Sequence, residues 1–403
     1  MKVLVINCGS SSIKYQLFDM GGCSVIAAGV VERIGEAASR LIHRRRAETD
    51  RFDETADTLS VPNHRDGLQH IATALTESGT LRDPSELFGI GHRVVHGGEA
   101  FQAPTLITKK VVQGIREMIP LAPLHNPANL LGIEVSLELV PDVPQVAVFD
   151  TAFHQSIPAH AFHYALPHEL YTAHHVRRYG FHGTSHHYVA KQAASHLGKP
   201  LEALNLITLH LGNGASATAI RAGKSIDTSM GMTPLEGLIM GTRCGDIDPA
   251  IHFFLARTTG QSNDELESLL NTESGLKGIC GKNDMREVIS LSDSGDDRAK
   301  LAIDMYCYRI KKYIGAYFAA LGRVDALVFT GGIGENAALI RQRACEGLHN
   351  LGISIDYERN QSGSRDTFEI QVKDGAVKIL VIPTNEELEI ATQTVTCVQT
   401  GDQ

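Results

Sequence analysis

The sequence predicts an α/β protein with two domains. Its 403 residues exceed the roughly 100–200 residues of a typical single domain. Short apolar runs rich in β-branched residues alternate with segments of helical period, as expected where helices pack on mixed sheets. One strand-turn-strand-turn-strand pattern occurs at the N-terminus and again in the middle of the chain, which indicates an internal duplication.

The repeat begins with a short strand in each copy. The expected strands of the first copy are residues 3–7, 13–18 and 24–31. Those of the second copy are residues 206–211, 217–221 and 225–228. The turns 8–12 (CGSSS) and 212–216 (GNGAS) occupy the same place in the two copies, because each follows the first strand.

Helices and buried strands fill the rest of the chain. The expected helices are residues 65–77, 129–139, 185–197, 263–270 and 298–321. The expected buried strands are residues 145–149 and 326–330. Near the C-terminus, Asn385 is suited to cap a last helix, because Glu386 and Glu387 then lie in its first turn and favour the positive end of the helix dipole.

Composition and charge exclude several classes of function. Asp and Glu (46) outnumber Lys and Arg (37), and the formal net charge of −9 argues against nucleic acid as a partner. The one basic run, 43–46, precedes acidic residues and is expected to be a solvated loop. No run approaches the ~18–20 apolar residues of a membrane span, and we expect no signal peptide. Seven scattered cysteines without a CxxC pair favour a reducing cytoplasm.

Three glycine-rich turns follow expected strands, at 8–12, 212–216 and 331–336 (GGIGEN). Glycine permits tight turns and close backbone approach to a ligand, and the exposed N–H groups of such turns bind phosphate oxygens. None has the Walker A spacing GxxxxGK[ST] or a full GxGxxG motif opening a helix. Together they indicate a nucleotide site of another kind.

Two arginines have glycine-rich neighbours: Arg93 in GHRVVHGGE and Arg243 in MGTRCGDIDPA. A planar guanidinium binds a carboxylate or phosphate with two parallel hydrogen bonds, which favours an anion site. The plainer interpretation is a structural ion pair with a nearby acid such as Glu99 or Asp246.

Seven motifs in order along the chain resemble the acetokinase family. They are LVINCGSSSIKY, GHRVVHGGE, GFHGTSHHYV, HLGNGASATAI, MGMTPLEGLIMGTRCGDIDPAI, VFTGGIGEN and PTNEELEIA. The resemblance implies the sugar kinase, heat-shock-70 and actin superfamily: two domains, each with a duplicated ribonuclease-H-like core, and an interdomain cleft for nucleotide. It implies a first domain at 1–150 joined by a C-terminal helix at 386–403, and a nucleotide-binding second domain at 151–385.

The resemblance also implies a reaction and its partners. The chain would transfer a phosphoryl group reversibly from ATP to acetate, directly and in line, giving acetyl phosphate and ADP. Mg²⁺ would be required, with Mn²⁺ as a substitute, and the domains would close over the nucleotide to exclude water. A homodimer is implied, with no membrane partner.

Residue roles follow from the resemblance at the matching positions. The implied catalytic residues are Asp150, His182 and Arg243. The implied magnesium-site residues are Asn7 and Glu386. The implied phosphate- and nucleotide-contacting residues are Ser10, Ser12, Lys14, His210, Leu211, Gly212, Asn213, Gly214, Asp284, Met285, Arg286, Gly332, Ile333, Gly334, Glu335 and Asn336. The implied acetate-site residues are Arg93, which would hold the carboxylate, His125 nearby, and Val95, Leu124, Phe181 and Pro234, which would wall a methyl pocket.

The family's usual role for Asp150 is proton transfer, but the chemistry argues otherwise. Acetate is already ionised at pH 7, so no proton must be removed before it attacks phosphorus. We expect Asp150 to orient Arg243, or water around the metal.

The three histidines of GFHGTSHHYV admit several interpretations. His182 and His186 have the i, i+4 spacing of a zinc-binding helix, but the motif lacks the glutamate of HExxH. Gly183 places His182 before the helix. The resemblance assigns His182 to the transferring phosphoryl group, while His186 and His187 are expected to be helix-start and packing residues. A covalent phosphohistidine is an open alternative that direct transfer does not require.

Two departures from the family pattern and two rival functions remain. Cys244 stands where serine is frequent and Ala100 where lysine is common; a thiol beside Arg243 could have a lowered pKa, although an inert side chain is the preferred interpretation.

The rival in the same family is a kinase for propionate or butyrate, with Val95 as the size gate. The rival of another class is an ATP-driven, actin-like protein clamp.

Overall fold

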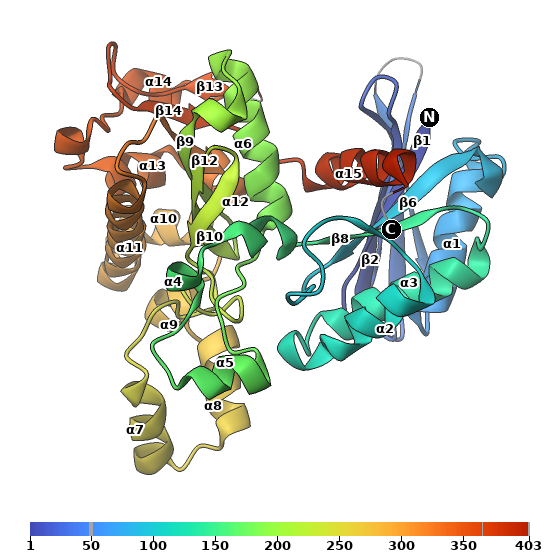
Figure 1. Cartoon of the computed structure of the whole chain (residues 1–403), viewed down its shortest axis with the longest axis horizontal. Coiled ribbons are helices and arrows are strands. Elements are labelled where there is room, and N and C mark those ends of the chain that lie inside the picture. Colours follow the sequence, from blue (N-terminus) through green and yellow to red (C-terminus); the bar gives the residue numbers. More distant parts are fainter. Residues whose placement is uncertain (48–50, 365, 402–403) are drawn as a thin grey trace. The chain divides into compact units, whose positions relative to one another are not determined.

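The computed structural model describes residues 1–47, 51–364 and 366–401, and the chain divides into two compact units (Figure 1). Unit 1 is Met1–Phe153 with Asn385–Gln403, and unit 2 is His154–Thr384. Residues 402–403, the end of the C-terminal helix predicted at 386–403, lie outside the described residues. None of the helices in the described part of the chain combines the length and apolar character needed to span a membrane.

Unit 1 is built on an eight-stranded sheet of order β5-β4-β3-β2-β1-β6-β8-β7. Its strands are β1 (Lys2–Cys8), β2 (Ser12–Asp19), β3 (Ser24–Glu32), β4 (Ser39–Arg46), β5 (Phe52–Leu59), β6 (Leu87–Val94), β7 (Thr105–Leu106) and β8 (Gln145–Phe149). Its α-helices are α1 (His64–Glu77), α2 (Lys109–Glu117), α3 (Asn126–Leu139) and α15 (Glu386–Thr400). β1 to β5 form an antiparallel meander, whereas β6 and β8 run parallel to β1 and are reached through helical crossovers.

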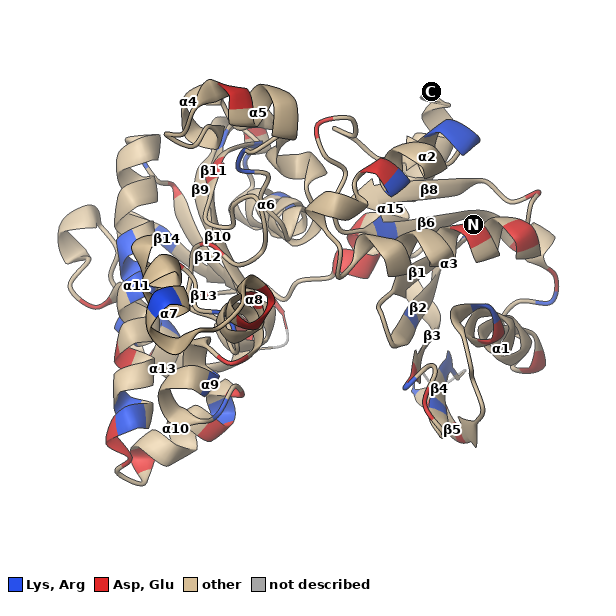
Figure 2. Ribbon diagram, turned by 90° about the horizontal axis from the view of Figure 1, so that it is seen from below, with Lys and Arg blue, Asp and Glu red and all other residues tan. Residues whose placement is uncertain are grey.

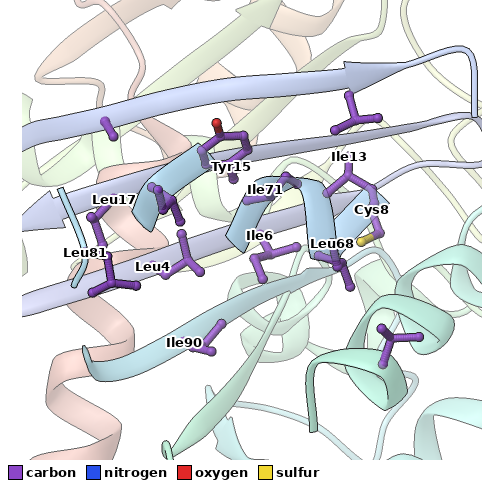
Figure 3. Packing of buried hydrophobic residues seen from close by; sticks show 14 of the residues in the cluster. Leu4, Ile6, Cys8, Ile13, Tyr15, Leu17, Leu68, Ile71, Leu81 and Ile90 are labelled. Carbon is purple, nitrogen blue, oxygen red and sulfur yellow. The ribbon is translucent and has the colours of Figure 1, made fainter. Parts of the chain in front are cut away.

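Helices cover both faces of this sheet, so β1 is apolar on both sides. Leu4, Ile6 and Cys8 pack with α1 and α3, and Figure 3 shows them among the labelled residues of that core. Val3 and Val5 point to the opposite face and pack with α15. Because side chains alternate along a strand, a helix on each face turns the usual alternating pattern into a continuous apolar run.

The expectation of a solvated loop at residues 43–46 is wrong. These residues end β4, which pairs with β5 in an antiparallel hairpin. Arg44 pairs with Glu54 across the hairpin at 2.6 Å, and Arg45 with Asp53 at 3.3 Å. β5 is exposed and lies at the edge of the sheet, so charged side chains are tolerated there and discourage pairing with another chain.

Unit 2 repeats the topology of unit 1 on a six-stranded sheet of order β11-β10-β9-β12-β14-β13. Its strands are β9 (Asn205–Leu211), β10 (Ala215–Arg221), β11 (Lys224–Thr228), β12 (Ala326–Thr330), β13 (Phe368–Glu369) and β14 (Lys378–Val381). β9, β10 and β11 are antiparallel like β1, β2 and β3, and β12 and β14 continue in parallel like β6 and β8. The predicted internal duplication is confirmed.

The helices of unit 2 include several that the sequence did not predict. They are α4 (Ala159–Phe162), α5 (His168–His174), α6 (Gly183–Leu197), α7 (Ala250–Thr259), α8 (Asn263–Thr272), α9 (Gly275–Cys280), α10 (Met285–Asp293), α11 (Asp297–Leu321), α12 (Gly331–Asn336), α13 (Ala338–Cys345) and α14 (Tyr357–Gln361). The expectation of an open turn at GGIGEN is wrong, because this segment is α12, a short helix that begins directly after β12.

Candidate active site

Arg93 and Asp150 form a two-pronged ion pair in unit 1. Arg93 is on β6, and Asp150 directly follows the neighbouring parallel strand β8, so the two side chains meet at the same edge of the sheet. Arg93 Nε donates to Asp150 Oδ1 at 3.1 Å and Nη2 donates to Oδ2 at 2.6 Å. The buried Asp150 carboxylate is the main reason that the pKa of Arg93 is raised. The acid that pairs with Arg93 is therefore Asp150 and not Glu99.

Glu386 is suited to hold a cation in unit 1. Its Oε2 atom is buried and has no hydrogen-bond partner among the described residues. Burial raises the pKa of Glu386 to about 7. The positive charge of Arg93 opposes this increase, whereas the charges of Asp150 and Glu387 add to it. A bound cation would stabilise a carboxylate that lies near other carboxylates and has a buried oxygen without a hydrogen bond. Glu386 therefore fits a magnesium site.

Asn7, the other expected magnesium-site residue, lies beside a cavity of about 220 Å³ in unit 1. Lys14 and Glu387 line the same cavity, and Asn7 pairs directly with Lys14 across β1 and β2. Ser10 and Ser12 belong to the tight turn between these strands, where Gly9 N donates to Ser12 O at 2.8 Å. In the described part of the chain, no group of three or more His, Cys, Asp or Glu side chains is arranged to hold a metal.

Arg243 in unit 2 has no acidic partner in the part of the chain that the structure describes. Its Nη1 donates to Pro234 O at 3.3 Å and contacts Met240 Sδ at 3.7 Å, and Arg243 has no ion-pair partner among the described residues. Burial alone lowers its pKa. The interpretation as an ion pair with Asp246 is wrong, because Asp246 instead pairs with Arg309 at 3.4 Å. A half-buried guanidinium with no acid beside it in this part of the structure is suited to an anionic ligand.

His182 and Arg243 converge on Gly214, in the turn between β9 and β10. A Cβ atom at Gly214 would lie 3.4 Å from His182 Nε2 and 3.6 Å from Arg243 Nη1. The absence of a side chain at Gly214 therefore keeps open a position that both side chains approach. A phosphoryl oxygen at this position could accept from both.

His182 is held in an unusual backbone conformation. It precedes α6, as predicted, with a left-handed φ of 57°, which costs energy for a residue other than glycine. Its ring stacks on His210, with 4.3 Å between ring centroids. His182 Nδ1 is 2.9 Å from Ser216 Oγ, and His210 Nδ1 is 2.8 Å from Ser185 Oγ. The imidazole of His182 is thus fixed on two sides.

A cavity of about 650 Å³ lies at the carboxyl ends of β9 and β12 in unit 2. Its lining residues are Gly212, Asn213, Asn283, Asp284, Met285, Arg286, Ile289, Gly332, Ile333, Asn336 and Ala337. The structure therefore brings together residues from three segments that the family resemblance assigns to the nucleotide, 210–214, 284–286 and 332–336. Asn283, Ile289 and Ala337 were missed, although Ile289 follows Met285 by one turn of α10 and could have been found from the helical period.

Gly331 explains how two of these segments come together. Its φ is +76°, and a Cβ atom there would lie 2.8–3.0 Å from backbone atoms of Leu211. Glu335 Oε1 accepts from Gly331 N at 2.9 Å and from Thr384 N at 3.1 Å, so this carboxylate secures the start of α12. Leu211 and Gly334 are buried. None of Leu211, Gly334 and Glu335 lines the cavity.

The expected acetate-site residues are divided between the units. Val95 is buried in unit 1, His125 precedes α3 there, and Leu124 is 68% exposed. Phe181 is buried in unit 2, and the carbonyl of Pro234 accepts from Arg243.

Cys244 has the properties of an inert side chain. Burial raises the pKa of its thiol, opposite in direction to the lowering considered from its position beside Arg243. A thiol with a raised pKa is a poor nucleophile at neutral pH.

His186 is completely buried in α6, and its two ring nitrogens contact Thr208 and Ser216. It is therefore more than a packing residue. His187 lies on the same helix and is half-buried.

Known proteins resemble this chain over almost its whole length. The model of the acetokinase family matches residues 2–392. A protein named acetate kinase from Syntrophobacter fumaroxidans is 58% identical over 400 residues, covering 99% of this chain and 97% of the relative. Another, from Sulfurovum sp., is 56% identical over 395 residues and covers 98% of each chain.

Solved structures agree with the sequence matches. The acetate kinase of Porphyromonas gingivalis has a TM-score of 0.93 at 44% identity, covering 98% of this chain and 99% of that one. A propionate kinase from Francisella tularensis has a TM-score of 0.91, also at 44% identity and with the same coverage. The predicted duplicated, two-domain α/β fold is confirmed by these likenesses and by the topology of the two sheets. The chain belongs to the acetokinase family.

Proposed function

We propose that this chain transfers the γ-phosphoryl group of ATP to acetate, reversibly and with Mg²⁺, to give acetyl phosphate and ADP. The observation that carries the proposal is the guanidinium of Arg243, which has no acid partner among the described residues and converges with His182 on Gly214. An unpaired charge at this position is suited to an anion that arrives with the substrates.

The 650 Å³ cavity of unit 2 is suited to the nucleotide. Its wall combines glycine backbone at Gly212 and Gly332 with the apolar side chains of Ile289 and Ile333. Apolar side chains suit the base, while the backbone N–H groups of a glycine-rich turn suit phosphate oxygens.

Arg93 is our candidate for binding the acetate carboxylate. Asp150 occupies the Nε and Nη2 side of the guanidinium, which leaves the Nη1 hydrogens and the second Nη2 hydrogen for another carboxylate. An end-on, two-pronged contact with acetate therefore remains possible while Asp150 holds the arginine. In this proposal Asp150 orients Arg93, in place of Arg243 or the water around the metal as expected from the sequence, and it removes no proton from the substrate. Val95, Leu124, Phe181 and Pro234 are our candidates for contact with the methyl group, and His125 is a further acetate-site candidate.

Phosphoryl transfer leaves little covalent work to the protein. Arg243 and His182 stabilise the negative charge on the equatorial oxygens while the acetate oxygen attacks in line with the leaving ADP oxygen. By comparison with other preorganised donors, loss of either side chain should lower kcat by about 10²–10³.

Mg²⁺, or Mn²⁺ in its place, would be held through Asn7 and Glu386 and would neutralise charge on the phosphates. Two protein ligands suffice, because Mg²⁺ retains waters and binds substrate phosphates. The unused Oε2 of Glu386 supports this assignment. The phosphates are suited to contact with the turn Gly9 to Ser12, which includes Ser10 and Ser12, and with Lys14 on the following strand.

A preference for propionate is the second candidate, because a propionate kinase is as similar in sequence identity as the P. gingivalis acetate kinase. One methylene changes discrimination by only about 1–3 kcal/mol in an apolar pocket, so the preference is one of degree.

We also propose that the chain acts as a homodimer, with α7 in the interface. This ten-residue helix has no buried residue, and Phe253 and Phe254 are 59% and 57% exposed. In Figure 2 its ribbon is tan apart from one basic residue, so the helix is almost uncharged, and its exposed large apolar side chains are Ile251, Phe253 and Phe254. Such a face is stabilised by burial against another copy. Six of the seven cysteines, namely Cys8, Cys23, Cys244, Cys280, Cys307 and Cys345, form no disulfide, which supports a reducing compartment such as the cytoplasm.

Trapping of the product with hydroxylamine tests the proposed reaction. The purified protein is incubated with ATP and Mg²⁺ and with acetate, propionate, butyrate or glycerol, and both hydroxamate and ADP are measured. We expect hydroxamate with acetate and less with each longer acid. ADP without hydroxamate, stimulated by a peptide and not by acetate, would instead favour the actin-like clamp.

A further inference from the structure

Four side chains of unit 2 form a continuous chain of hydrogen bonds that ends at His182. Thr208 Oγ1, on β9, is 2.7 Å from His186 Nδ1. The other ring nitrogen, His186 Nε2, is 2.7 Å from Ser216 Oγ on β10. Ser216 Oγ is in turn 2.9 Å from His182 Nδ1. Thr208, His186 and Ser216 are all completely buried, so water does not compete for these bonds.

The hydrogens in this chain can be assigned by counting donors and acceptors. Burial lowers the pKa of His186 well below its usual value, so its ring is neutral and carries one N–H. If that N–H were on Nδ1, it would donate to Thr208, and the Thr208 hydroxyl hydrogen would have no acceptor among the described residues. A buried, stranded donor is costly.

In the opposite arrangement, the Thr208 hydroxyl, the His186 ring N–H and the Ser216 hydroxyl each have an acceptor. Thr208 donates to His186 Nδ1, His186 Nε2–H donates to Ser216 Oγ, and the Ser216 hydroxyl donates to His182 Nδ1. His182 Nδ1 is then an acceptor, and the hydrogen of a neutral His182 ring is on Nε2. This is the nitrogen that approaches Gly214 beside Arg243.

We propose that His186 and Ser216 are positioning residues, which together with Thr208 fix His182 as the Nε2–H tautomer and thereby present a hydrogen-bond donor to the transferring phosphoryl group. The catalytic part of this inference rests on the proposed function. The series of hydrogen bonds from Thr208 to His182 does not depend on the proposed function, because it is a property of the protein without substrates.

The neighbours of His186 make the arrangement stable to changes in pH. His154 packs edge-on against the His186 ring at 5.8 Å, and His210 does so at 6.4 Å. Charge on either neighbour would disfavour a second charge on His186, which acts in the same direction as its burial. His186, which determines the donor and acceptor roles in this series of hydrogen bonds, therefore stays neutral. It orients the ring of His182 through Ser216.

A matched pair of variants separates positioning from packing. His186→Gln keeps an amide N–H near the position of Nε2 and an oxygen for Thr208, whereas His186→Met fills similar space without hydrogen bonds. We expect His186→Gln to retain most of the activity and His186→Met to lose about tenfold in kcat with KM for ATP unchanged, as for one lost hydrogen bond. A packing role predicts the reverse order, because Met is the better buried side chain. Ser216→Ala, a small change, should behave like His186→Met and serves if that variant fails to fold.

Nitrogen NMR of the ¹⁵N-histidine-labelled resting protein gives the direct measurement. We expect His182 to carry its hydrogen on Nε2 in the wild type and in His186→Gln, and to lose this preference in Ser216→Ala. An Nδ1–H or evenly mixed tautomer in the wild type, or equal kcat for the Gln and Met variants, would overturn the inference. A fixed Nε2–H tautomer in a protein that forms no acetyl phosphate would support the chain and contradict only the proposed function.

Discussion

Asp150 holds Arg93 from the side, with Oδ1 at 3.1 Å from Nε and Oδ2 at 2.6 Å from Nη2. The two residues are 57 positions apart and meet because β6 and β8 are parallel neighbours. This relationship gives Asp150 a task that requires no proton transfer.

The first prediction concerns Asp150→Asn. An amide keeps the shape but removes the charge that orients Arg93, so kcat/KM for acetate should fall about tenfold to a hundredfold, mainly through KM. The measurement is initial rate against acetate concentration at pH 7 and pH 9. Recovery of activity at the higher pH would contradict an orienting role, because it would indicate that the wild-type carboxylate removes a proton.

The second prediction concerns Gly214→Ala. The added methyl would stand at ordinary contact distance from His182 and Arg243, so the fold should tolerate it, but it would occupy the position assigned to the phosphoryl oxygens. We expect kcat to fall about 10²-fold with little change in Tm. Gly315→Ala on α11 is the matched control, since a Cβ there meets no atom within 4 Å, and it should leave kcat unchanged. Equal kcat for the two variants would exclude this position for the transferring group.

The third prediction concerns Arg243→Met. Because the half-buried guanidinium has no acid partner in the described part of the chain, its removal should stabilise the ligand-free protein by about 1 kcal/mol, or about 2–4 °C in Tm for a unit of this size. The same change should lower kcat by about 10³. Calorimetry without ligands and steady-state assays measure the two effects. A lower Tm with retained activity would show that Arg243 is a structural residue.

The fourth prediction concerns stability at acid pH. Burial lowers the pKa of His92, His96 and His154 to about 4, whereas an unfolded histidine titrates near ~6.5. The unfolded chain therefore binds more protons in this range, and stability should fall as pH decreases from ~6.5 toward ~4, by up to about 1.4 kcal/mol per pH unit for each histidine. Above ~6.5 these groups should add no pH dependence.

Urea unfolding at pH 8, 7, 6 and 5 measures this effect. His92 accepts or donates one hydrogen bond, to Gln145 at 2.8 Å, so His92→Gln offers a polar side chain that does not titrate. The variant should show a shallower decline below pH 6.5 than the wild type. Identical slopes for the two proteins would remove His92 from the explanation.

The fifth prediction concerns the metal. Treatment with a chelator should abolish activity, and Mg²⁺ alone should restore it fully, since the proposed ligands are oxygen atoms. Glu386→Gln should raise the Mg²⁺ concentration required for half-maximal rate by at least about tenfold. Glu387→Gln, one residue further, is the comparison variant and should shift it less. Restoration by Zn²⁺ but not Mg²⁺ would contradict the assignment and revive a histidine site.

Local patterns predicted much of the fold. The apolar run 3–7 and the helical period of 298–321 correspond to β1 and α11, because burial of a regular face determines each element. The helix at GGIGEN was not predicted, because glycine residues generally disfavour a helix. In the structure, Gly331 adopts a positive φ close to the backbone of Leu211, and the Glu335 carboxylate accepts from Gly331 N and stabilises the start of the helix. Such tertiary contacts cannot be predicted from the neighbouring residues in the sequence.

The candidate site was predictable to a similar extent. Residue types and glycine-rich neighbours drew attention to Arg93 and Arg243, and the family resemblance assigned the roles of Arg93, His182 and Arg243. Their partners depend on strand order and could not be predicted from spacing. The pairing of Arg93 with Asp150 requires the parallel contact of β6 and β8, and the role of His186 requires β9 and β10 beside α6.

The central claim is that the phosphoryl group is transferred to a carboxylate and not to water. ³¹P NMR of the protein with ATP, Mg²⁺ and acetate measures this directly. We predict one acetyl phosphate for each ADP, no early inorganic phosphate, and formation of ATP when acetyl phosphate and ADP are supplied instead. One inorganic phosphate for each ADP from the earliest time points, with no acetyl phosphate, would contradict the claim.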